Sequence, residues 1–489
     1  MRRFFIGIAV VIVLLAAVVL FRTLTLSPPA PASEAPPTQV PAVNAMDVAQ
    51  HLAQAVRFRT VSYGAHAHEA EKNAELDKLR AWMETTYPNF HRVATREIIG
   101  KSLLFTWKGA NPSLAPVLLM AHMDVVPVVP GTDRLWTHGP FSGDIADGFV
   151  WGRGSIDDKG SLISILDAAE RLAAAGFTPA RTIMFAFGQD EEVGGATGNG
   201  EMAKTLAKRG MHYAFVLDEG GTIQTEPYPG VHRPVAYVAV AEKGYLTLKL
   251  VAHGTGGHSS TPTTDLAIAH LSKAVLATVD HPFASGLDEV QTRKLSTLAP
   301  YTPFGTRLLL ANLWLMKPLV VAELNAKQDG AARMHTTISP TIIEGGVKDN
   351  VLPPEATATI NFRLNARDTV ASVIQHVRDA VNDPRVDVVE DHETVEEASK
   401  VADMDGETFK LLTHEIHATF GDIPVAPDST TGATDSRHYL PIADNVYRLD
   451  PFHFGPTDLT RVHGNNERLA VSDLGLGVTF YMRLMKDIR

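Results

Sequence analysis

Residues 117–124, VLLMAHMD, are the stretch from which the fold and the chemistry of this chain can be predicted. The apolar residues 117–121 are typical of a buried strand in a parallel sheet. His122 and Asp124 stand two residues apart, so their side chains leave an extended backbone on the same face. Such a pair can present an imidazole to a metal ion while the carboxylate orients a neighbouring ligand. Alone, the pair also fits an ordinary surface histidine.

Acidic residues recur beside the next two expected strands. In a doubly wound sheet the carboxyl ends of the strands line one crevice, so these groups are expected to converge there. Neighbouring carboxylates repel one another unless a cation lies among them, although a helix cap or a solvated loop would also explain them. The acids are Asp157 and Asp158 in the glycine-rich loop 151–160, residues 190–192 after the strand 182–187, and Asp218 and Glu219 after the strand 214–217.

The composition argues against nucleic-acid binding and excludes cysteine as a metal ligand. The 489 residues carry a net charge of −11 and no basic stripe, which argues against nucleic acid as a partner. There is no cysteine, so a transition-metal site must be built from His, Asp and Glu. The length favours two domains preceded by a leader.

The N-terminus predicts a membrane segment. Arg2 and Arg3 precede 18 residues, 4–21, that are all apolar or Gly, which approaches the length of a bilayer span. The Pro/Ala-rich segment 27–41 is expected to be an extended tether. An uncleaved single-pass signal anchor is favoured, and cleavage after residues 30–32, APA, is the alternative. Both interpretations place the catalytic part outside the cytoplasm, in the periplasm or the extracellular space.

The segment from residue 244 has a different pattern. It predicts the order β-α-β-β-α-β, which is typical of a ferredoxin-like domain. The fold class expected is therefore α/β, with a doubly wound, mostly parallel main sheet, an inserted ferredoxin-like α+β domain and an N-terminal transmembrane helix. The expected boundaries are 1–44 for anchor and tether, 45–243 and 393–489 for the catalytic domain, and 244–392 for the insertion. Residues 282–328 receive no assignment.

Six short motifs occur in an order that resembles a known family. The chain is similar over residues 45–489 to the co-catalytic zinc peptidases that include glutamate carboxypeptidase, aminoacylase and carboxypeptidase S. It is particularly similar to the carboxypeptidase S branch, which includes secreted N-acyl amino acid hydrolases. The resemblance implies that the main sheet is catalytic and that the insertion is a lid or dimerisation domain. The motifs are HMD at 122–124, GSIDDKG at 154–160, DEEVGG at 190–195, LDEGG at 217–221, GGHSS at 256–260 and VHGNNE at 462–467.

The resemblance implies two zinc ions bridged by Asp157. Relatives differ in which acid of the fourth motif binds metal, and Asp218 is preferred to Glu219 because it directly ends the strand. The implied ligands are His122, Asp157 and Asp218 for one ion, and Asp157, Glu192 and His463 for the other.

Further roles are implied by the same resemblance. Glu191 would be the general base, and Asp124 would support His122. His258 would stabilise the oxyanion, often from the other subunit of a homodimer. Asn350 and Arg363 would hold the substrate's carbonyl and carboxylate, since an arginine can grip a carboxylate with two hydrogen bonds. A turn asparagine and a sheet-surface arginine are the structural alternatives.

The function expected is that of a di-zinc amidohydrolase or carboxypeptidase. A hydroxide held between the ions would release a free amino acid from a dipeptide, a peptide C-terminus or an N-acyl amino acid. One alternative is a serine hydrolase using Ser259 or Ser260, which chelators would not inhibit. Another is a catalytically silent metal-binding domain, which would lack an equivalent of Glu191; that glutamate is present.

Overall fold

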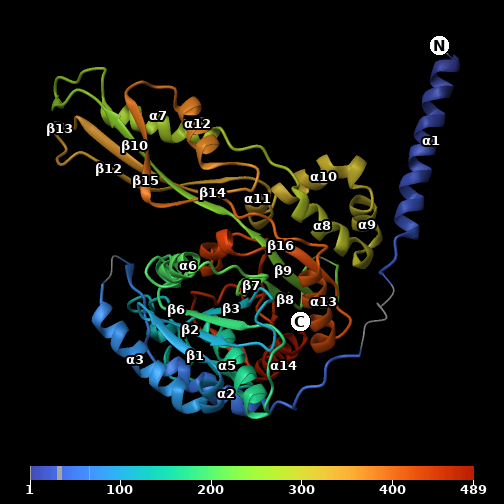
Figure 1. Cartoon of the computed structure of the whole chain (residues 1–489). Helices are drawn as coiled ribbons and strands as arrows, with labels where there is room; N and C mark the ends of the chain where they lie inside the picture. Colours follow the sequence, from blue (N-terminus) through green and yellow to red (C-terminus); the bar gives the residue numbers. More distant parts are fainter. Residues whose placement is uncertain (1, 30–35, 65–66, 229) are drawn as a thin grey trace.

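The computed structural model describes residues 2–29, 36–64, 67–228 and 230–489. A large mixed sheet with its helices forms the lower half of the molecule in Figure 1, and a smaller sheet extends away from it. The N-terminal helix stands to one side of both. The cleavage site considered at residues 30–32 lies outside the described residues.

The strand predicted from VLLMAH lies inside the large sheet. All six residues of β3 (Val117–His122) are buried, because helices cover both faces of the sheet. It pairs in parallel with β6 (Ile183–Gly188) on one side and β7 (Phe215–Asp218) on the other. The carboxyl ends of these strands therefore meet at one edge, as the sequence predicts.

This sheet contains both parallel and antiparallel pairs, and the parallel ones include β8–β18 at one edge. Its order is β1-β2-β6-β3-β7-β17-β9-β8-β18, with β16 paired in parallel to β9. The pairs β1–β2, β2–β6, β8–β9 and β9–β17 are antiparallel. The sheet is thus mixed. The pairs β3–β6, β3–β7, β7–β17, β9–β16 and β8–β18 are parallel, in agreement with the expected mostly parallel sheet, and the antiparallel pairs depart from it. A tight turn at Gly100, with φ of +63°, joins β1 to β2, and such a turn can only connect antiparallel strands.

The remaining elements of this part are short strands and covering helices. The strands are β1 (Thr95–Ile99), β2 (Ser102–Trp107), β4 (Asp144–Ala146), β5 (Phe149–Trp151), β8 (Thr222–Gln224), β9 (Val235–Glu242), β16 (Val425–Thr430), β17 (Val446–Arg448), β18 (His453–Phe454) and β19 (Arg468–Ala470). The helices are α2 (Ala45–Arg57), α3 (Glu69–Thr86), α4 (Pro88–Val93), α5 (Lys159–Ala174), α6 (Asn199–Lys208), α13 (Glu407–Phe420) and α14 (Val471–Asp487).

The smaller sheet has the predicted β-α-β-β-α-β order. Its strands run antiparallel in the order β12-β14-β10-β15, and α7 (Ala267–Asp280) and α12 (Val370–Val381) pack on it. Alternate residues of β10 are buried, which is typical of a sheet covered on one face. The strands are β10 (Gly244–His253), β12 (Thr337–Gly345), β14 (Glu355–Leu364) and β15 (Val386–Glu396), with a two-stranded ribbon of β11 (Gly257–His258) and β13 (Val351–Leu352).

One residue, Lys243, separates β9 of the large sheet from β10 of the smaller one. Its Nζ donates hydrogen bonds to the carbonyl oxygens of Ala332, at 2.7 Å, and His335, at 2.8 Å. After β15 the chain returns to the part built on the large sheet. At the end of β15, Glu396 Oε1 lies 3.0 Å from Arg437 Nε of that part. The two sheets are thus joined by two short connections.

Residues 282–328, to which the sequence analysis assigned no structure, form most of a cluster of short helices. These helices enclose a small apolar core that includes Leu287, Leu310 and Val320. Their brevity, and Pro318 within α10, explain why no clear helical period is visible in the sequence. They are α8 (Glu289–Leu298), α9 (Phe304–Leu310), α10 (Leu313–Asn325) and α11 (Gln328–Met334).

A buried carboxylate fastens these helices to β16. Asp428 Oδ2 lies 2.7 Å from Lys294 Nζ of α8, and Asp428 Oδ1 lies 3.1 Å from Arg333 Nη1 of α11. Burial alone would raise the pKa of Asp428, but the charges of Arg333 and Lys294 outweigh it and the pKa is lowered. The ion pairs therefore stabilise the fold above the pKa of an unfolded aspartate, about 4.

We expect Asp428→Asn to destabilise the protein by about 3 kcal/mol at neutral pH, because it removes the buried negative charge that faces Lys294 and Arg333. The difference in melting temperature between wild type and variant is expected to shrink as the pH falls below about 4 and Asp428 becomes protonated. Thermal unfolding across pH measures both. A difference that stayed constant over this range would contradict the assignment to these ion pairs.

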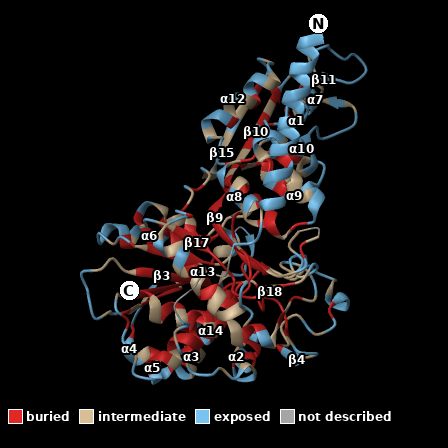
Figure 2. Ribbon diagram, turned by 90° about the vertical axis from the view of Figure 1, so that its right-hand side faces the viewer, coloured by how far each residue is buried: buried red, intermediate tan, exposed pale blue. Residues whose placement is uncertain are grey.

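The N-terminal apolar run forms α1 (Arg2–Thr25). Its best 18-residue window has a mean hydropathy of 3.3, and within the described residues it is the one unbroken helix long and apolar enough to cross a bilayer. A signal sequence would meet the same criterion. Figure 2 shows α1 almost wholly exposed. Val19 and Thr23, near the end of the helix, are buried.

Candidate metal centre

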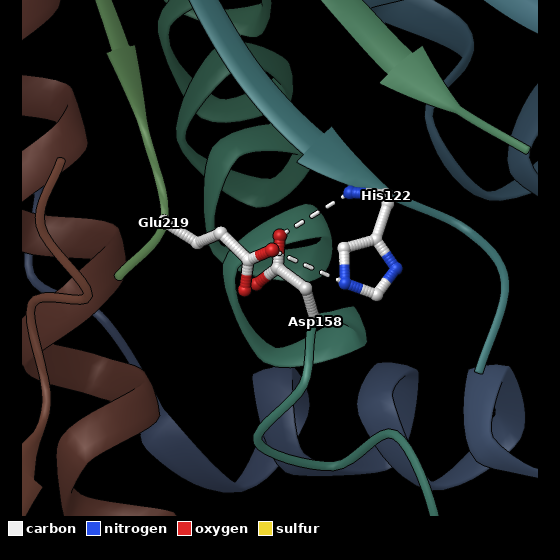
Figure 3. A group of neighbouring side chains, drawn as sticks. All are labelled: His122, Asp158 and Glu219. Atoms are coloured by element: carbon white, nitrogen blue, oxygen red, sulfur yellow. Dashed lines mark hydrogen bonds and ion pairs between the residues drawn. The ribbon is translucent and has the colours of Figure 1, made fainter. Parts of the chain in front are cut away.

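His122 lies at the carboxyl end of β3 with its side chain fully buried. Its Nε2 is 2.8 Å from Asp157 Oδ1 and 3.3 Å from Glu219 Oε1. Figure 3 shows Glu219 and Asp158 approaching His122 from two different segments of chain. Nitrogen and oxygen donors at these separations can bind one cation.

A second group of donors lies on the other side of Asp157. His463 Nε2 is 3.0 Å from Asp157 Oδ2 and 3.0 Å from Glu192 Oε2. The two oxygens of Asp157 therefore face the two histidines. This is the arrangement expected of a carboxylate that bridges two metal ions.

A buried ion pair supports the loops that carry Asp157 and His463. Glu467 Oε1 accepts hydrogen bonds from the backbone N–H groups of Ile156, at 2.9 Å, and Asp157, at 3.2 Å. Its Oε2 lies 2.6 Å from Arg153 Nη1, and Arg153 Nη2 donates to the carbonyl oxygen of His463 at 3.0 Å. The sequence analysis gave no role to Arg153 or Glu467. Glu467 is the last residue of the VHGNNE motif, so this motif could have indicated it.

Asp124 supports more than His122. His122 Nδ1 lies 2.9 Å from the backbone oxygen of Asp124 and 3.5 Å from its Oδ1. The Asp124 carboxylate also accepts hydrogen bonds from the backbone N–H groups of Glu191, at 3.2 Å, and Glu192, at 3.3 Å. It therefore positions the turn that presents both glutamates.

The geometry favours Glu219 over the predicted Asp218 as a ligand. Asp218 Oδ2 accepts a hydrogen bond from the backbone N–H of Ser436 at 2.8 Å, whereas Glu219 reaches His122. Successive side chains of a strand point to opposite sides, so only one of the two acids can face the metal centre. We therefore prefer Glu219, the residue after the one that ends β7, as the candidate ligand, and the choice of Asp218 made from the sequence remains to be tested.

Asp158 is a further acid that the sequence analysis did not include among the ligands. Its Oδ2 accepts a hydrogen bond from the backbone N–H of His122 at 3.2 Å. Ligand atoms of His122, Asp158 and Glu219 lie within 4.8 Å of one another, as do those of His122, Asp157 and Glu192. Asp158 and Asp157 thus approach His122 from the same loop.

The pKa shifts of these groups indicate a site that favours positive charge. Burial, reinforced by the charge of Asp157, raises the pKa of Glu192 to about 7. Hydrogen bonds with Asp157 and Glu192 raise the pKa of His463 to about 10. Burial opposes ionisation of Asp157, but hydrogen bonds from His122 and His463 lower its pKa. Glu192 and His463 therefore favour their protonated forms, whereas Asp157 favours its charged form.

The donors fit divalent zinc. Two imidazoles and several carboxylates, without thiolates, form a usual nitrogen and oxygen set for this ion. Asp158 Oδ1 is buried and accepts no hydrogen bond from the described residues, so a polar atom there still lacks a partner.

His258, predicted to stabilise the oxyanion, and Asn350 and Arg363, predicted to hold the substrate, contact other residues of the smaller domain in this structure. His258 is exposed on β11, and its Nδ1 lies 2.8 Å from Ser260 Oγ in a local turn. The Asn350 carbonyl accepts a hydrogen bond from the backbone N–H of Ser259 at 3.2 Å. The Arg363 guanidinium stacks on Tyr245, 4.3 Å from the ring centre. Figure 1 shows β13, which pairs with β11, at the end of the smaller sheet remote from β3.

This fold and this centre define a metallohydrolase of the metallopeptidase class. The chain belongs to peptidase family M20/M25/M40, whose model matches residues 118–487. It is 39% identical over 451 residues to "Probable carboxypeptidase S-like 2" of Dictyostelium discoideum, covering 90% of this chain and 85% of that protein. It is 33% identical over 458 residues to the human "N-fatty-acyl-amino acid synthase/hydrolase PM20D1", covering 92% of this chain and 89% of that protein.

Solved structures share the fold at lower identity. The M20 family metallo-carboxypeptidase Sso-CP2 from Sulfolobus solfataricus superimposes with a TM-score of 0.65 at 17% identity, covering 90% of this chain and 98% of that one. Human carnosine dipeptidase 1 superimposes with a TM-score of 0.62 at 16% identity, covering 91% of this chain and 96% of that one. The family membership predicted from the six motifs is confirmed.

Proposed function

We propose that this protein is a di-zinc amidohydrolase that releases a free amino acid from an N-acyl amino acid, a dipeptide or a peptide C-terminus. The observation that carries this proposal is the position of Asp157 between His122 and His463. His122, Asp157 and Glu219 would hold one ion, and Asp157, Glu192 and His463 the other.

Glu191 is the proposed general base. It sits in the turn η3 (Glu191–Val193) directly before the ligand Glu192, and its side chain is only partly buried. Among the described residues none donates a hydrogen bond to its carboxylate, so the carboxylate is available to a water molecule or a substrate. In this role it accepts the proton of the attacking water and passes it to the departing amine.

Zinc ions bound at this centre would lower the pKa of that water and polarise the amide carbonyl. The chain's own residues orient the reactants and exclude solvent. Asp124 fixes the turn that carries Glu191, and Glu467 fixes the loop that carries Asp157. The smaller sheet is proposed to act as a lid that brings His258, Asn350 and Arg363 toward the substrate. His258 could equally be supplied across a homodimer.

The substrate class rests on similarity to relatives whose names describe carboxypeptidases and N-fatty-acyl-amino acid hydrolases. A cavity of about 280 Å³ begins beside Glu219, where Gly220, Gly221 and Thr222 line it together with Arg333 of α11. This cavity is proposed to hold one end of the substrate. The N-terminal helix α1 is proposed to anchor the protein in a membrane, with the catalytic part in the periplasm or the extracellular space.

We expect a chelator to abolish amino-acid release by the intact chain, and zinc to restore it. The measurement is release of free amino acid from a panel of dipeptides and N-acyl amino acids, before and after metal removal. The ranking of the panel would identify the preferred substrate class. Full activity in the metal-free protein would contradict the proposal and would favour the serine-hydrolase alternative.

A further inference from the structure

An apolar surface covers one side of the helix α10, and α9 before it adds one exposed phenylalanine. Trp314 is 54% exposed, Leu315 42% and Leu319 60%. Pro318 is also exposed, and spacings of four residues place 314 with 318 and 315 with 319 on one face of α10. Phe304 of α9 is 52% exposed beside them in the chain. Single exposed apolar residues are ordinary, but a group of this size marks an interaction surface.

The joint between α9 and α10 is fastened to the end of α1. The fully buried amide of Asn312 donates hydrogen bonds to the carbonyl oxygen of Val19, at 3.3 Å, and to Thr23 Oγ1, at 3.2 Å. Arg22 Nε donates to the carbonyl oxygen of Ala311 at 3.1 Å. Polar contacts of this kind hold helices together where apolar packing gives little preference. The contact therefore fixes α9 and α10 beside the last two turns of α1.

This attachment sets the depth of the apolar surface relative to a membrane. The apolar run of α1 ends at Phe21, two residues or about 3 Å along the axis from Val19. In Figure 1 the helices α8–α11 lie between α1 and the smaller sheet. Helices that cross membranes tilt by up to about 40° from the bilayer normal. If α1 is tilted in this way, the bilayer surface reaches α9 and α10 before it reaches the smaller sheet.

We propose that the exposed apolar face of α10, together with Phe304 of α9, inserts into the bilayer leaflet next to the catalytic domain and forms a second membrane contact beside α1. The inference rests on the proposed anchoring by α1. The chemistry of the face suits a membrane interface, where tryptophan is enriched. The one lysine beside this face is held by the protein, because Lys317 Nζ donates a hydrogen bond to the carbonyl oxygen of Leu287 at 3.1 Å. Lys317 is the one charged residue between Trp314 and Leu319. A second copy of this chain is the competing occupant.

Trp314 provides an intrinsic probe. Trp107, Trp136 and Trp151 are no more than 8% exposed, and Trp82 is partly buried. The intact chain, with α1 shown to be present by mass spectrometry, is reconstituted into phosphatidylcholine vesicles whose acyl chains are either brominated or not. Bromine quenches only tryptophans that enter the hydrocarbon. We expect lower emission in brominated vesicles, and we expect Trp314→Phe to abolish the difference.

A double variant separates insertion from mere proximity. Leu315→Glu with Leu319→Glu keeps Trp314 and is expected to reduce the quenching severalfold while hydrolysis of a water-soluble dipeptide stays unchanged. Ile343→Glu is the matched control, since Ile343 is 65% exposed on β12 of the smaller sheet, and quenching should persist in it. Equal emission of the wild type in both lipids would overturn the inference.

A separate experiment tests whether α1 anchors the protein, and its negative result can be told apart from a negative quenching result. If alkaline carbonate strips the intact chain from the vesicles, anchoring by α1 is refuted, whereas quenching of Trp314 before stripping would still support the contact. A chain that resists carbonate but shows no quenching would retain its anchor and lose the proposed second contact. If dimers detected by crosslinking then disappear in the double glutamate variant, the face is an interface between copies.

Discussion

Glu191→Gln is expected to reduce kcat by about 10³-fold, because the substitution removes the proposed general base and leaves the neighbouring ligands in place. Gln keeps the size of the side chain, and the backbone N–H of residue 191 can still donate to Asp124. The zinc content should therefore remain two ions per chain. Release of amino acid, with metal measured by elemental analysis on the same sample, tests this expectation.

Two further variants serve as comparisons for Glu191→Gln. Glu192→Gln should lose metal as well as activity, because Glu192 Oε2 lies against His463. Glu201→Gln, on the exposed side of α6, should leave both unchanged. Normal turnover by Glu191→Gln would remove Glu191 as the base, and a loss of activity that merely followed a loss of zinc would place it among the ligands.

The second large effect is expected at Glu219. Glu219→Gln should weaken binding of one of the two ions by at least about 100-fold and lower activity accordingly, because Glu219 reaches His122 Nε2. Asp218→Asn is the matched control, since an amide oxygen can still accept the hydrogen bond from the Ser436 N–H. This control should keep both ions.

Metal titration of the demetallated variants, followed by calorimetry, distinguishes the two acids. The opposite pattern, with the metal lost in Asp218→Asn and kept in Glu219→Gln, would restore the assignment made from the sequence. Loss in both variants would indicate that either substitution disturbs the end of β7.

Much of the centre could be predicted because its residues follow strands. The strands β3, β6 and β7 are continuous apolar runs, so their ends are visible in the sequence, and His122, Glu192 and Glu219 lie at or just beyond them. The choice between Asp218 and Glu219 was not visible, because it depends on how the backbone turns after β7. Asp158 was ambiguous for the same reason, since adjacent acids in a loop can both turn inward.

Other features were hidden because they depend on distant partners. Glu467 acts through Arg153 and the backbone of Asp157, more than 300 residues away in the chain. The helices α8–α11 are short and individually weak in pattern, and contacts such as those of Asp428 with Lys294 and Arg333 stabilise them. The antiparallel pairs β1–β2 and β8–β9 join strands that are close in the chain, whereas β2–β6 and β9–β17 join distant ones, and apolar runs alone specify neither kind.

The single-residue link at Lys243 has a mechanical consequence. Two bodies joined at two points can rotate freely only about the line through those points, so Lys243 and the segment after Glu396 define one axis for the smaller sheet. Lys243 also holds the carbonyl oxygens of Ala332 and His335, at the end of the helices that carry the apolar face of α10. Rotation about this axis must break those hydrogen bonds or drag the end of α11 along. Because Arg333 of α11 is also paired with Asp428 of β16, the hydrogen bonds of Lys243 limit how far the smaller sheet can turn while α11 stays with the large sheet.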